Sequence, residues 1–203
     1  MCPKIVDREA KKLEILQAAL QVFSQKGISN TKMIDIARAA SIGKGTIYEY
    51  FSSKEDIFIT GFHQFFAGYD EMISNAIKKQ DHPSEQLKVL IHVSLEAIFE
   101  EQKDFIGILM DFWAEGIRSK DNSMEDAIHL KEMYQNYRMM IRQIIDRGIA
   151  QGVFRPIDSM AFASFLLAAI DGLMLQWVME PELFDMKQIA ESLCDGMLNG
   201  IRN

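Results

Sequence analysis

The sequence TKMIDIARAASIGKGTIYEYF, residues 31–51, decides the fold of this chain. It predicts a helix over residues 32–40 with Thr31 as the N-cap, a turn at residues 41–43 and a second helix over residues 44–51. Gly43 is expected to supply the backbone angles that the turn requires. Two short helices joined by a tight turn form a helix-turn-helix, whose second helix enters the major groove of DNA.

The second helix of this motif combines an inward apolar face with outward polar groups. Ile47 and Phe51 are one helical turn apart and are expected to pack inward. The remaining positions carry groups that can contact phosphates or base edges, and a glycine that allows close approach of the backbone. The alternative is a solvated surface, which is the usual role of an isolated lysine. The candidates are Lys44, Gly45, Thr46, Tyr48 and Tyr50.

Residues 10–60 resemble the N-terminal signature of the TetR family of bacterial transcriptional regulators. The matching elements are Thr31, the pair Ile36-Ala37, the block at residues 45–51 and Lys54. One departure is that family members often carry Gly-Val-Ser where this chain has the sequence Ser-Ile-Gly at residues 41–43. The resemblance implies further DNA contacts at the start of the first helix of the motif and at the lysine that opens the next helix: Thr31, Lys32, Met33 and Lys54.

The rest of the chain predicts helices and no strands. Gly, Pro and polar residues mark the ends of the predicted helices. These helices cover residues 7–26, 83–102, 104–118, 124–150 and 158–180, and a last one begins at residue 185. A further helix, opened by a capping box at residues 52–55, is expected to reach residue 79. We therefore expect an all-α fold of about nine helices, as the family resemblance also implies. A helix-turn-helix domain would occupy residues 1–53 and an effector-binding and dimerisation domain residues 54–203, joined by one continuous helix.

Charge and composition favour a DNA-binding protein over an enzyme or a metalloprotein. The net charge is −7, but residues 1–60 hold nine Lys/Arg against seven Asp/Glu, so the positive charge gathers beside the motif. The two cysteines and four histidines have no metal-ligand spacing, and no nucleophile–base motif or phosphate-binding loop is present. We expect no catalysis, metal or cofactor. The N-terminus has no apolar signal-peptide core, so a cytoplasmic protein is expected.

Residues 160–179 are apolar enough to raise the question of a membrane span. Asp171 lies near the centre of this segment, where a charge costs about 2.5–3.5 kcal/mol on insertion. A buried helix is therefore the better interpretation. A buried carboxylate needs a partner, and Arg138, Arg142 or a second copy of the chain are the candidates.

Methionine and aromatic side chains are frequent in the second domain, with 13 Met and 13 Phe in the whole chain. Met adapts to irregular spaces, so a mainly apolar cavity for a small hydrophobic effector is expected. The alternative is an ordinary core. The candidates for the effector site are Phe65, Tyr69, Phe99, Met110, Trp113, Met133, Tyr137 and Phe165.

Dimers of helix-turn-helix proteins read two half-sites of a palindrome, so a dimer surface is expected. Apolar residues recur at helical spacing on the last two predicted helices, and two such helices from each subunit form a four-helix interface in the family. The alternative is a core stripe within one chain. The candidates for the dimer interface are Phe162, Leu166, Ile170, Leu173, Trp177, Ile189, Leu193 and Met197.

The resemblance implies a homodimeric regulator, by default a repressor, that a small hydrophobic effector releases from a palindromic operator in double-stranded DNA. Two alternatives stay open from the residues alone. One is an architectural DNA-binding protein without an effector, and the other is a helical enzyme or carrier.

Overall fold

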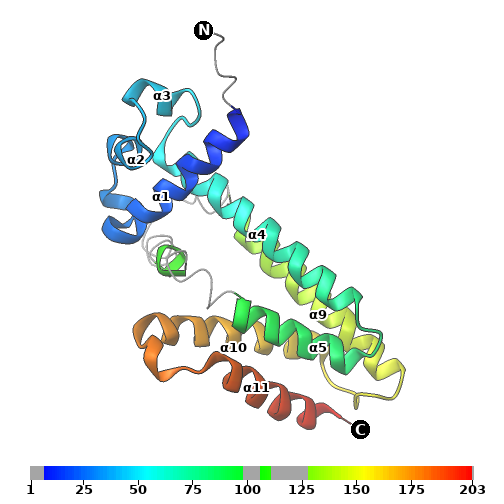
Figure 1. Cartoon of the computed structure of the whole chain (residues 1–203). Helices are drawn as coiled ribbons and strands as arrows, with labels where there is room; N and C mark the ends of the chain where they lie inside the picture. Colours follow the sequence, from blue (N-terminus) through cyan, green and yellow to red (C-terminus); the bar gives the residue numbers. More distant parts are fainter. Residues whose placement is uncertain (1–6, 98–105, 111–127, 203) are drawn as a thin grey trace. The chain divides into compact units, whose positions relative to one another are not determined.

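The computed structural model describes residues 7–97, 106–110 and 128–202 (Figure 1). Within these ranges every regular element is a helix, and the β pairing consists of one isolated antiparallel bridge between Phe154 and Arg202. The all-α prediction is confirmed. The chain divides into two compact units, one formed by residues 1–66 and 107–128, the other by residues 67–106 and 129–203. This division falls inside a helix, and the predicted domain boundary after residue 53 stays a prediction.

The first unit contains α1 (Arg8–Asn30), α2 (Met33–Ala39), α3 (Lys44–Tyr48) and the first half of α4 (Lys54–Lys78). Asp7 caps α1, because its carboxylate accepts the backbone N–H groups of Glu9 and Ala10 at 3.1 and 3.3 Å. Gly27 interrupts the regular helix with a φ of 72°. The predicted start at Asp7 and the predicted break at Gly27 are confirmed, and one further turn follows the break.

The core of this unit joins all four helices. The rings of Phe23 on α1 and Phe58 on α4 meet edge to face, with centroids 6.5 Å apart. Ile36 and Ile47, each fully buried, fasten α2 and α3 to this core. The other buried side chains of the unit include Ile15, Ala19, Val22, Ala37, Phe51, Ile57 and Phe62.

The turn between α2 and α3 differs from the prediction. Gly43 has an ordinary extended conformation, with φ −70° and ψ 153°, and is the N-cap of α3. The left-handed residue is Ser41, with a φ of 54°. Family members often have glycine at this position, which is the residue that tolerates such a backbone best. The chain therefore uses a serine where a glycine is favoured and a glycine where a capping serine is favoured.

Two predicted caps are displaced by one residue. Thr31 is not the N-cap of α2; Lys32 is, and its backbone N–H donates to the Asp35 carboxylate at 3.1 Å. The capping pair before α4 is Ser53 and Asp56 and not the predicted pair at residues 52 and 55, because the Asp56 backbone N–H donates to Ser53 Oγ at 3.0 Å. α3 is also shorter than the predicted helix and ends at Tyr48.

The second unit holds the remainder of α4 and the helices α5 (Pro83–His92), α9 (Leu130–Ala150), α10 (Ser159–Met179) and α11 (Met186–Ile201). α5 continues into a π-helical turn, η1 (Val93–Ala97), and a 3₁₀ turn, η2 (Pro181–Leu183), connects α10 to α11. α9 packs against α5 and α10, and α11 packs against α5 and η1 (Figure 1). Asp158 and Asp185 cap α10 and α11 through backbone N–H groups, as the predicted starts of these helices require.

The predicted helix over residues 124–150 is interrupted. His129 has a left-handed backbone with a φ of 53°, and α9 begins after it at Leu130. Residues 106–110 are helical, within the predicted helix 104–118. Residues 98–102, 104–105, 111–118 and 124–127 of the predicted helices lie outside the described ranges.

Among the described helices, α10 alone is long and apolar enough to cross a membrane by length and composition. In the structure α10 packs against α9, and its Asp171 accepts a hydrogen bond from Tyr134 on α9 at 2.9 Å. These contacts fit the predicted role as a core helix.

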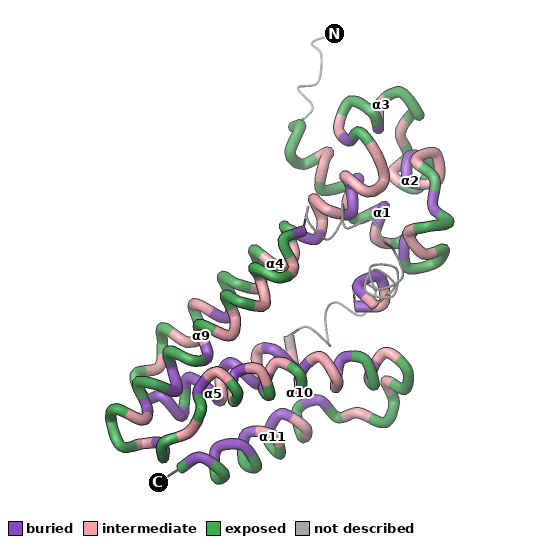
Figure 2. The backbone as a smooth tube through the Cα atoms, turned by 180° about the vertical axis from the view of Figure 1, so that it is seen from behind, coloured by how far each residue is buried: buried purple, intermediate pink, exposed green. Residues whose placement is uncertain are grey.

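The apolar residues predicted to form the dimer interface lie largely inside the protomer. Leu166 is fully buried, and Ile170, Trp177 and Met197 are each 8% exposed. These four residues belong to the core of the protomer, as the alternative predicted, and their part in a dimer interface stays a prediction. Phe162, Leu173, Ile189 and Leu193 are partly buried. Exposed and buried positions alternate along α10 (Figure 2), and helical spacing puts the exposed ones on another face: Ala161, Phe165, Ala168, Leu175, Gln176 and Met179.

Candidate nucleic-acid interface

Most of the predicted DNA contacts lie on the surface of α2 and α3. Lys32, Lys44, Gly45 and Tyr48 are exposed, with Tyr48 at 49%. Met33, Thr46 and Tyr50 are partly exposed. Directly beneath them, Ile36 and Ile47 are fully buried, so both helices have a fixed inner face and an open outer face. A short polar helix anchored in this way can contact base edges and phosphates without leaving the core.

Gly45 has an open surface above it. A Cβ atom placed on this residue would meet nothing within 4 Å, and its φ is not positive. Neither packing nor backbone geometry within the protein therefore requires a glycine here. The open space allows another molecule to approach the backbone of α3 closely.

Arg8 holds the C-terminal end of α3 from α1, a contact that the motif did not predict. Its guanidinium donates a hydrogen bond to the carbonyl oxygen of Glu49 at 3.2 Å and lies 5.9 Å from the ring centroid of Tyr50. A cation at a helix C-terminus also interacts favourably with the helix dipole. The two partners are 41 and 42 positions away in sequence, so no local pattern marks this pairing.

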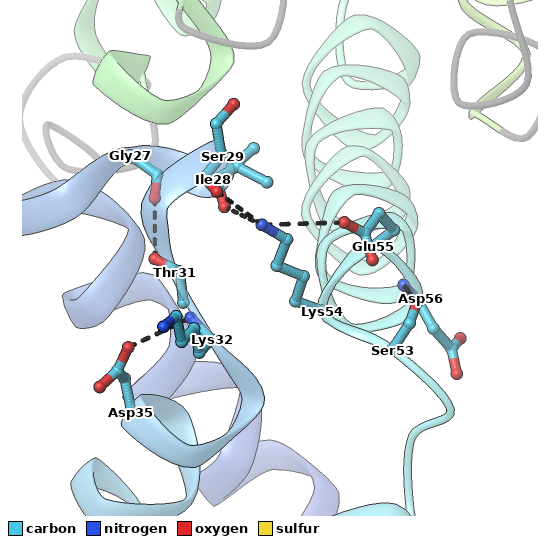
Figure 3. A network of polar contacts seen from close by, with 10 residues as sticks. All are labelled: Gly27, Ile28, Ser29, Thr31, Lys32, Asp35, Ser53, Lys54, Glu55 and Asp56. Atoms are coloured by element: carbon cyan, nitrogen blue, oxygen red, sulfur yellow. Dashed lines mark hydrogen bonds and ion pairs between the residues drawn. The ribbon is translucent and has the colours of Figure 1, made fainter. Parts of the chain in front are cut away.

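Two predicted contacts have internal roles (Figure 3). Thr31 is only 2% exposed, and its hydroxyl donates to the carbonyl oxygen of Gly27 at 2.7 Å. A side chain buried to this degree presents no surface to a duplex, so Thr31 is corrected from a contact to a structural residue. The Lys54 ammonium donates to the carbonyl oxygens of Ile28 and Ser29 at 2.7 and 2.9 Å.

An ion pair joins α1 to α2 beside these contacts. Lys26 Nζ lies 3.3 Å from the Asp35 carboxylate, which also accepts the Lys32 backbone N–H. The backbone hydrogen bond from Lys32 is the main reason that the pKa of Asp35 lies below its usual value. Burial opposes this shift, and the hydrogen bond and charge of Lys26 add to it. The start of α2 is thus fixed by polar contacts on both sides.

The predicted effector residues fall into several environments. Tyr69 and Tyr137 come together in the second unit, with ring centroids 6.1 Å apart. Met133 is partly exposed on the same helix as Tyr137, whereas Phe65 packs against Phe66 in the first unit. Met110 is also partly exposed, and Phe99 and Trp113 lie outside the described residues. Phe165 is 61% exposed on α10, so the prediction that it lines an internal pocket is wrong.

Three tyrosines and two carboxylates form a polar cluster in the second unit. Tyr69 donates to Ser94 on η1 at 2.8 Å, and Tyr137 donates to Asp70 at 2.5 Å. Tyr134, which sequence analysis missed, donates to Asp171. Burial raises the pKa of all three phenols, so they stay protonated and act as hydrogen-bond donors.

Asp171 has a direct partner that was not expected. Burial raises the pKa of its carboxyl, while the Tyr134 hydrogen bond and the charge of Arg138 act in the opposite direction. Arg138 also lies over the Tyr134 ring at 5.6 Å. Of the two predicted arginine partners, Arg138 contributes through its charge, whereas Arg142 pairs with Asp146 at 3.2 Å and is not the partner.

The histidines and the described cysteine form no reactive or metal-binding cluster in the described ranges. No group of three or more His, Cys, Asp or Glu residues able to hold a metal occurs there. His92 pairs with Glu96 at 2.6 Å. Cys194 is buried, which raises its thiol pKa to about 11 and keeps it protonated.

Comparison with known proteins assigns both parts of the chain. A family model described as "Bacterial regulatory proteins, tetR family" matches residues 15–60, and one described as "BetI-type transcriptional repressor, C-terminal" matches residues 83–201. The fatty acid metabolism regulator protein of Bacillus subtilis is 23% identical over 197 residues, which cover 97% of this chain and 98% of that protein.

Two solved structures share the fold. The regulator FadR from Bacillus subtilis in complex with stearoyl-CoA superposes with a TM-score of 0.78 at 23% identity, over 94% of this chain and 99% of that one. A transcriptional regulator from Saccharomonospora viridis in complex with choline gives a TM-score of 0.82 at 22% identity, over 96% and 99%. Because one family model covers more than half of the chain and another covers the helix-turn-helix, the chain belongs to the TetR family of bacterial transcriptional regulators.

Proposed function

We propose that this chain is a sequence-specific repressor that binds a palindromic operator through α2 and α3 and leaves it when a small molecule binds the second unit. The observation that carries the DNA-binding part is the outer face of α2 and α3, where exposed Lys32, Lys44 and Tyr48 surround the open backbone of Gly45. Every relative named above is a regulator, which supports regulation rather than catalysis. Its target is DNA, and we propose that it acts in the cytoplasm.

Gly45→Ala tests the DNA-binding face. The added methyl group meets nothing within 4 Å in the protein, and alanine favours a helix over glycine by about 0.5–1 kcal/mol. We therefore expect unfolding in urea to require more denaturant. If the backbone of α3 approaches a duplex, the same methyl group weakens binding by about tenfold or more, equivalent to about 1.4 kcal/mol.

The matched control is Gly68→Ala on α4, where an added Cβ also meets nothing within 4 Å. Its stability should rise similarly while DNA affinity stays unchanged. Both variants are titrated against a duplex that the wild-type protein enriches from a random-sequence library. Equal DNA affinity for Gly45→Ala and the wild type would exclude close approach of α3 to DNA.

For the effector site we propose the polar cluster around Tyr69, Tyr134 and Tyr137. Its phenols and the Asp171 carboxylate offer fixed hydrogen-bonding groups for the polar end of a mainly apolar small molecule. The π-helical turn η1, which holds Ser94, supports this placement because such turns are frequent at functional sites.

The probes for this site are stearoyl-CoA and choline, which the two structural relatives hold. Each is added to the complex of the protein with its selected duplex. Release of DNA by one probe, lost in Tyr134→Phe and kept in Gly68→Ala, would support the proposed site. Release that is unchanged in Tyr134→Phe would place the effector elsewhere.

We further propose a homodimer formed through the exposed apolar face of α10. Phe165 is 61%, Leu175 51% and Met179 73% exposed, and these residues follow one another at helical spacing. A patch of large apolar side chains on a single helix face is typical of a protein–protein contact. Leu183 on η2, 73% exposed, extends the patch.

A further inference from the structure

The junction between α1 and α2 depends on a lysine from a third helix. α1 ends with carbonyl groups that have no partner within the helix and must be satisfied in another way. Asn30 Nδ2 donates to the carbonyl of Lys26 at 3.1 Å, and Thr31 Oγ1 donates to that of Gly27 at 2.7 Å. The carbonyls of the next two residues both accept from Lys54 Nζ.

Lys54 is the one residue in this set that comes from outside the junction. It is the first residue of α4, and the carbonyl oxygens that it contacts lie 26 and 25 positions earlier in the chain. Its side chain is 20% exposed, and its ammonium group also lies 3.9 Å from the Glu55 carboxylate (Figure 3). An ammonium has three N–H donors, and two of them are used on these carbonyls.

The resemblance to the TetR family assigns Lys54 to a DNA phosphate, but these contacts give it a different role. A phosphate contact would have to rely on the remaining N–H or replace a charge-assisted hydrogen bond at a helix C-terminus, where a cation is already favoured. Lys32 and Lys44, by contrast, are exposed. The junction that Lys54 fixes leads directly into Lys32 and Met33, at the start of α2.

We propose that Lys54 is a positioning residue that fixes the α1–α2 junction against the first turn of α4, and that it governs sequence specificity rather than binding a phosphate. This inference rests on the proposed DNA binding by α2 and α3. Base-edge contacts depend on the exact placement of these helices, whereas non-specific affinity depends on the phosphate contacts. Removal of Lys54 therefore lowers specific binding and leaves non-specific binding and its salt dependence unchanged.

The test compares Lys54→Met, Lys54→Gln, Lys44→Met and Ile57→Val with the wild type. Each protein is titrated at several salt concentrations against the duplex enriched by the wild type and against a scrambled duplex of the same composition. Lys54→Gln keeps an amide N–H for one carbonyl. Ile57→Val removes a methyl group from the buried side of the same turn of α4 and leaves the hydrogen bonds of Lys54 in place.

We expect the ratio of specific to non-specific affinity to fall by about tenfold in Lys54→Met, by less in Lys54→Gln, and not at all in Ile57→Val. The salt dependence should match that of the wild type in both Lys54 variants. In Lys44→Met, where a phosphate contact is lost, the slope should fall by about one. Amide hydrogen exchange of Thr31, whose N–H bonds the Ile28 carbonyl at 3.2 Å, should accelerate in Lys54→Met only.

Two results would overturn the inference. Equal losses on both duplexes, with the salt slope reduced by about one in both Lys54 variants, would make Lys54 a phosphate contact. An affinity ratio unchanged from the wild type would make it a residue for stability alone. If Lys54→Met does not fold, Lys54→Gln distinguishes the same outcomes. Failure of the wild type to enrich any duplex would instead contradict the proposed function.

Discussion

At the scale of single residues, the turn of the helix-turn-helix carries strain at Ser41. Its φ of 54° costs about 1–2 kcal/mol for a residue with a Cβ, whereas glycine adopts it freely. Ser41→Gly should therefore raise the free energy of unfolding by about 1 kcal/mol. Ala39→Gly, in the last turn of α2, is the control and should lower it by about 0.5–1 kcal/mol. Urea denaturation measures both, and a loss of stability in Ser41→Gly would contradict this explanation of the turn.

The same turn shows what a motif in sequence can and cannot predict. Its position and its two helices followed from the apolar spacing of Ile36, Ala37 and Ile47, because buried positions on short helices are strongly constrained. The residue with positive φ did not follow. Gly43 carried the local signal for an unusual backbone, but the hydrogen bond from the Ile42 N–H to the Ala37 carbonyl, at 2.9 Å, places the left-handed residue two positions earlier, at Ser41.

Asp171 provides a second prediction at this scale. Because burial raises its pKa, the folded state holds the proton more tightly than the unfolded chain, whose pKa is near 3.8. The folded protein therefore loses stability as the pH rises from about 4 through the folded pKa, and this penalty persists at pH 7. Asp171→Asn removes the charge and keeps an acceptor for Tyr134.

Urea unfolding of Asp171→Asn and the wild type at pH 4 and pH 7 measures this penalty. The variant should gain stability relative to the wild type at pH 7 and gain less at pH 4. Asp195→Asn, which removes an exposed carboxylate from α11, controls for the change in net charge. A gain that is larger at pH 4 than at pH 7 would show that the ionised carboxylate stabilises the fold.

At the scale of elements, the end of α9 is held by close packing over Gly148. A Cβ atom at this position would lie 2.2 Å from Cδ2 of Phe154, whose ring is 1% exposed. Phe154 also forms the bridge to Arg202 after α11, so displacement of this ring disturbs the contact between two helix ends. Gly148→Ala should lower the free energy of unfolding by about 2–3 kcal/mol.

Gly68→Ala, an open position in α4, is the control for helix propensity and should raise stability by about 1 kcal/mol. Thermal unfolding of both variants gives the comparison. Equal free energies of unfolding for Gly148→Ala and the wild type would contradict this prediction, because they would mean that the Phe154 ring can move away without loss of stability.

Helix ends were predictable where one side chain decides them, but the inward face of α10 was not predictable. Asp7, Asp158 and Asp185 each accept backbone N–H groups at the start of a helix, a local interaction that the sequence displays directly. The inward face of α10 had no such marker, because the helix is apolar on nearly every side. The stripe through Leu166 and Ile170 and the stripe through Phe165, Ala168 and Leu175 both follow helical spacing, and only packing against α9 distinguishes them.

At the scale of the whole molecule, DNA recognition by one helix-turn-helix covers few base pairs, so the proposed palindrome requires two copies of the chain. The exposed side chains of α10 are available for this purpose without unfolding the protomer. Phe165→Glu combined with Leu175→Glu places two charges in the proposed interface, where they would be buried without partners. We expect the wild type to sediment as a dimer and the double variant as a folded monomer in analytical ultracentrifugation.

Met139→Glu introduces a charge at another exposed apolar position, on α9, and should remain dimeric. We expect the double variant to fold, because both substituted positions are already in contact with solvent in the protomer, and circular dichroism checks that each variant is folded.

Loss of the dimer should also remove the link between two half-sites about 34–36 Å apart. The monomer should then bind a duplex with one half-site as well as one with two, whereas the wild type should favour the complete palindrome. A double variant that stays dimeric would move the interface away from this face of α10.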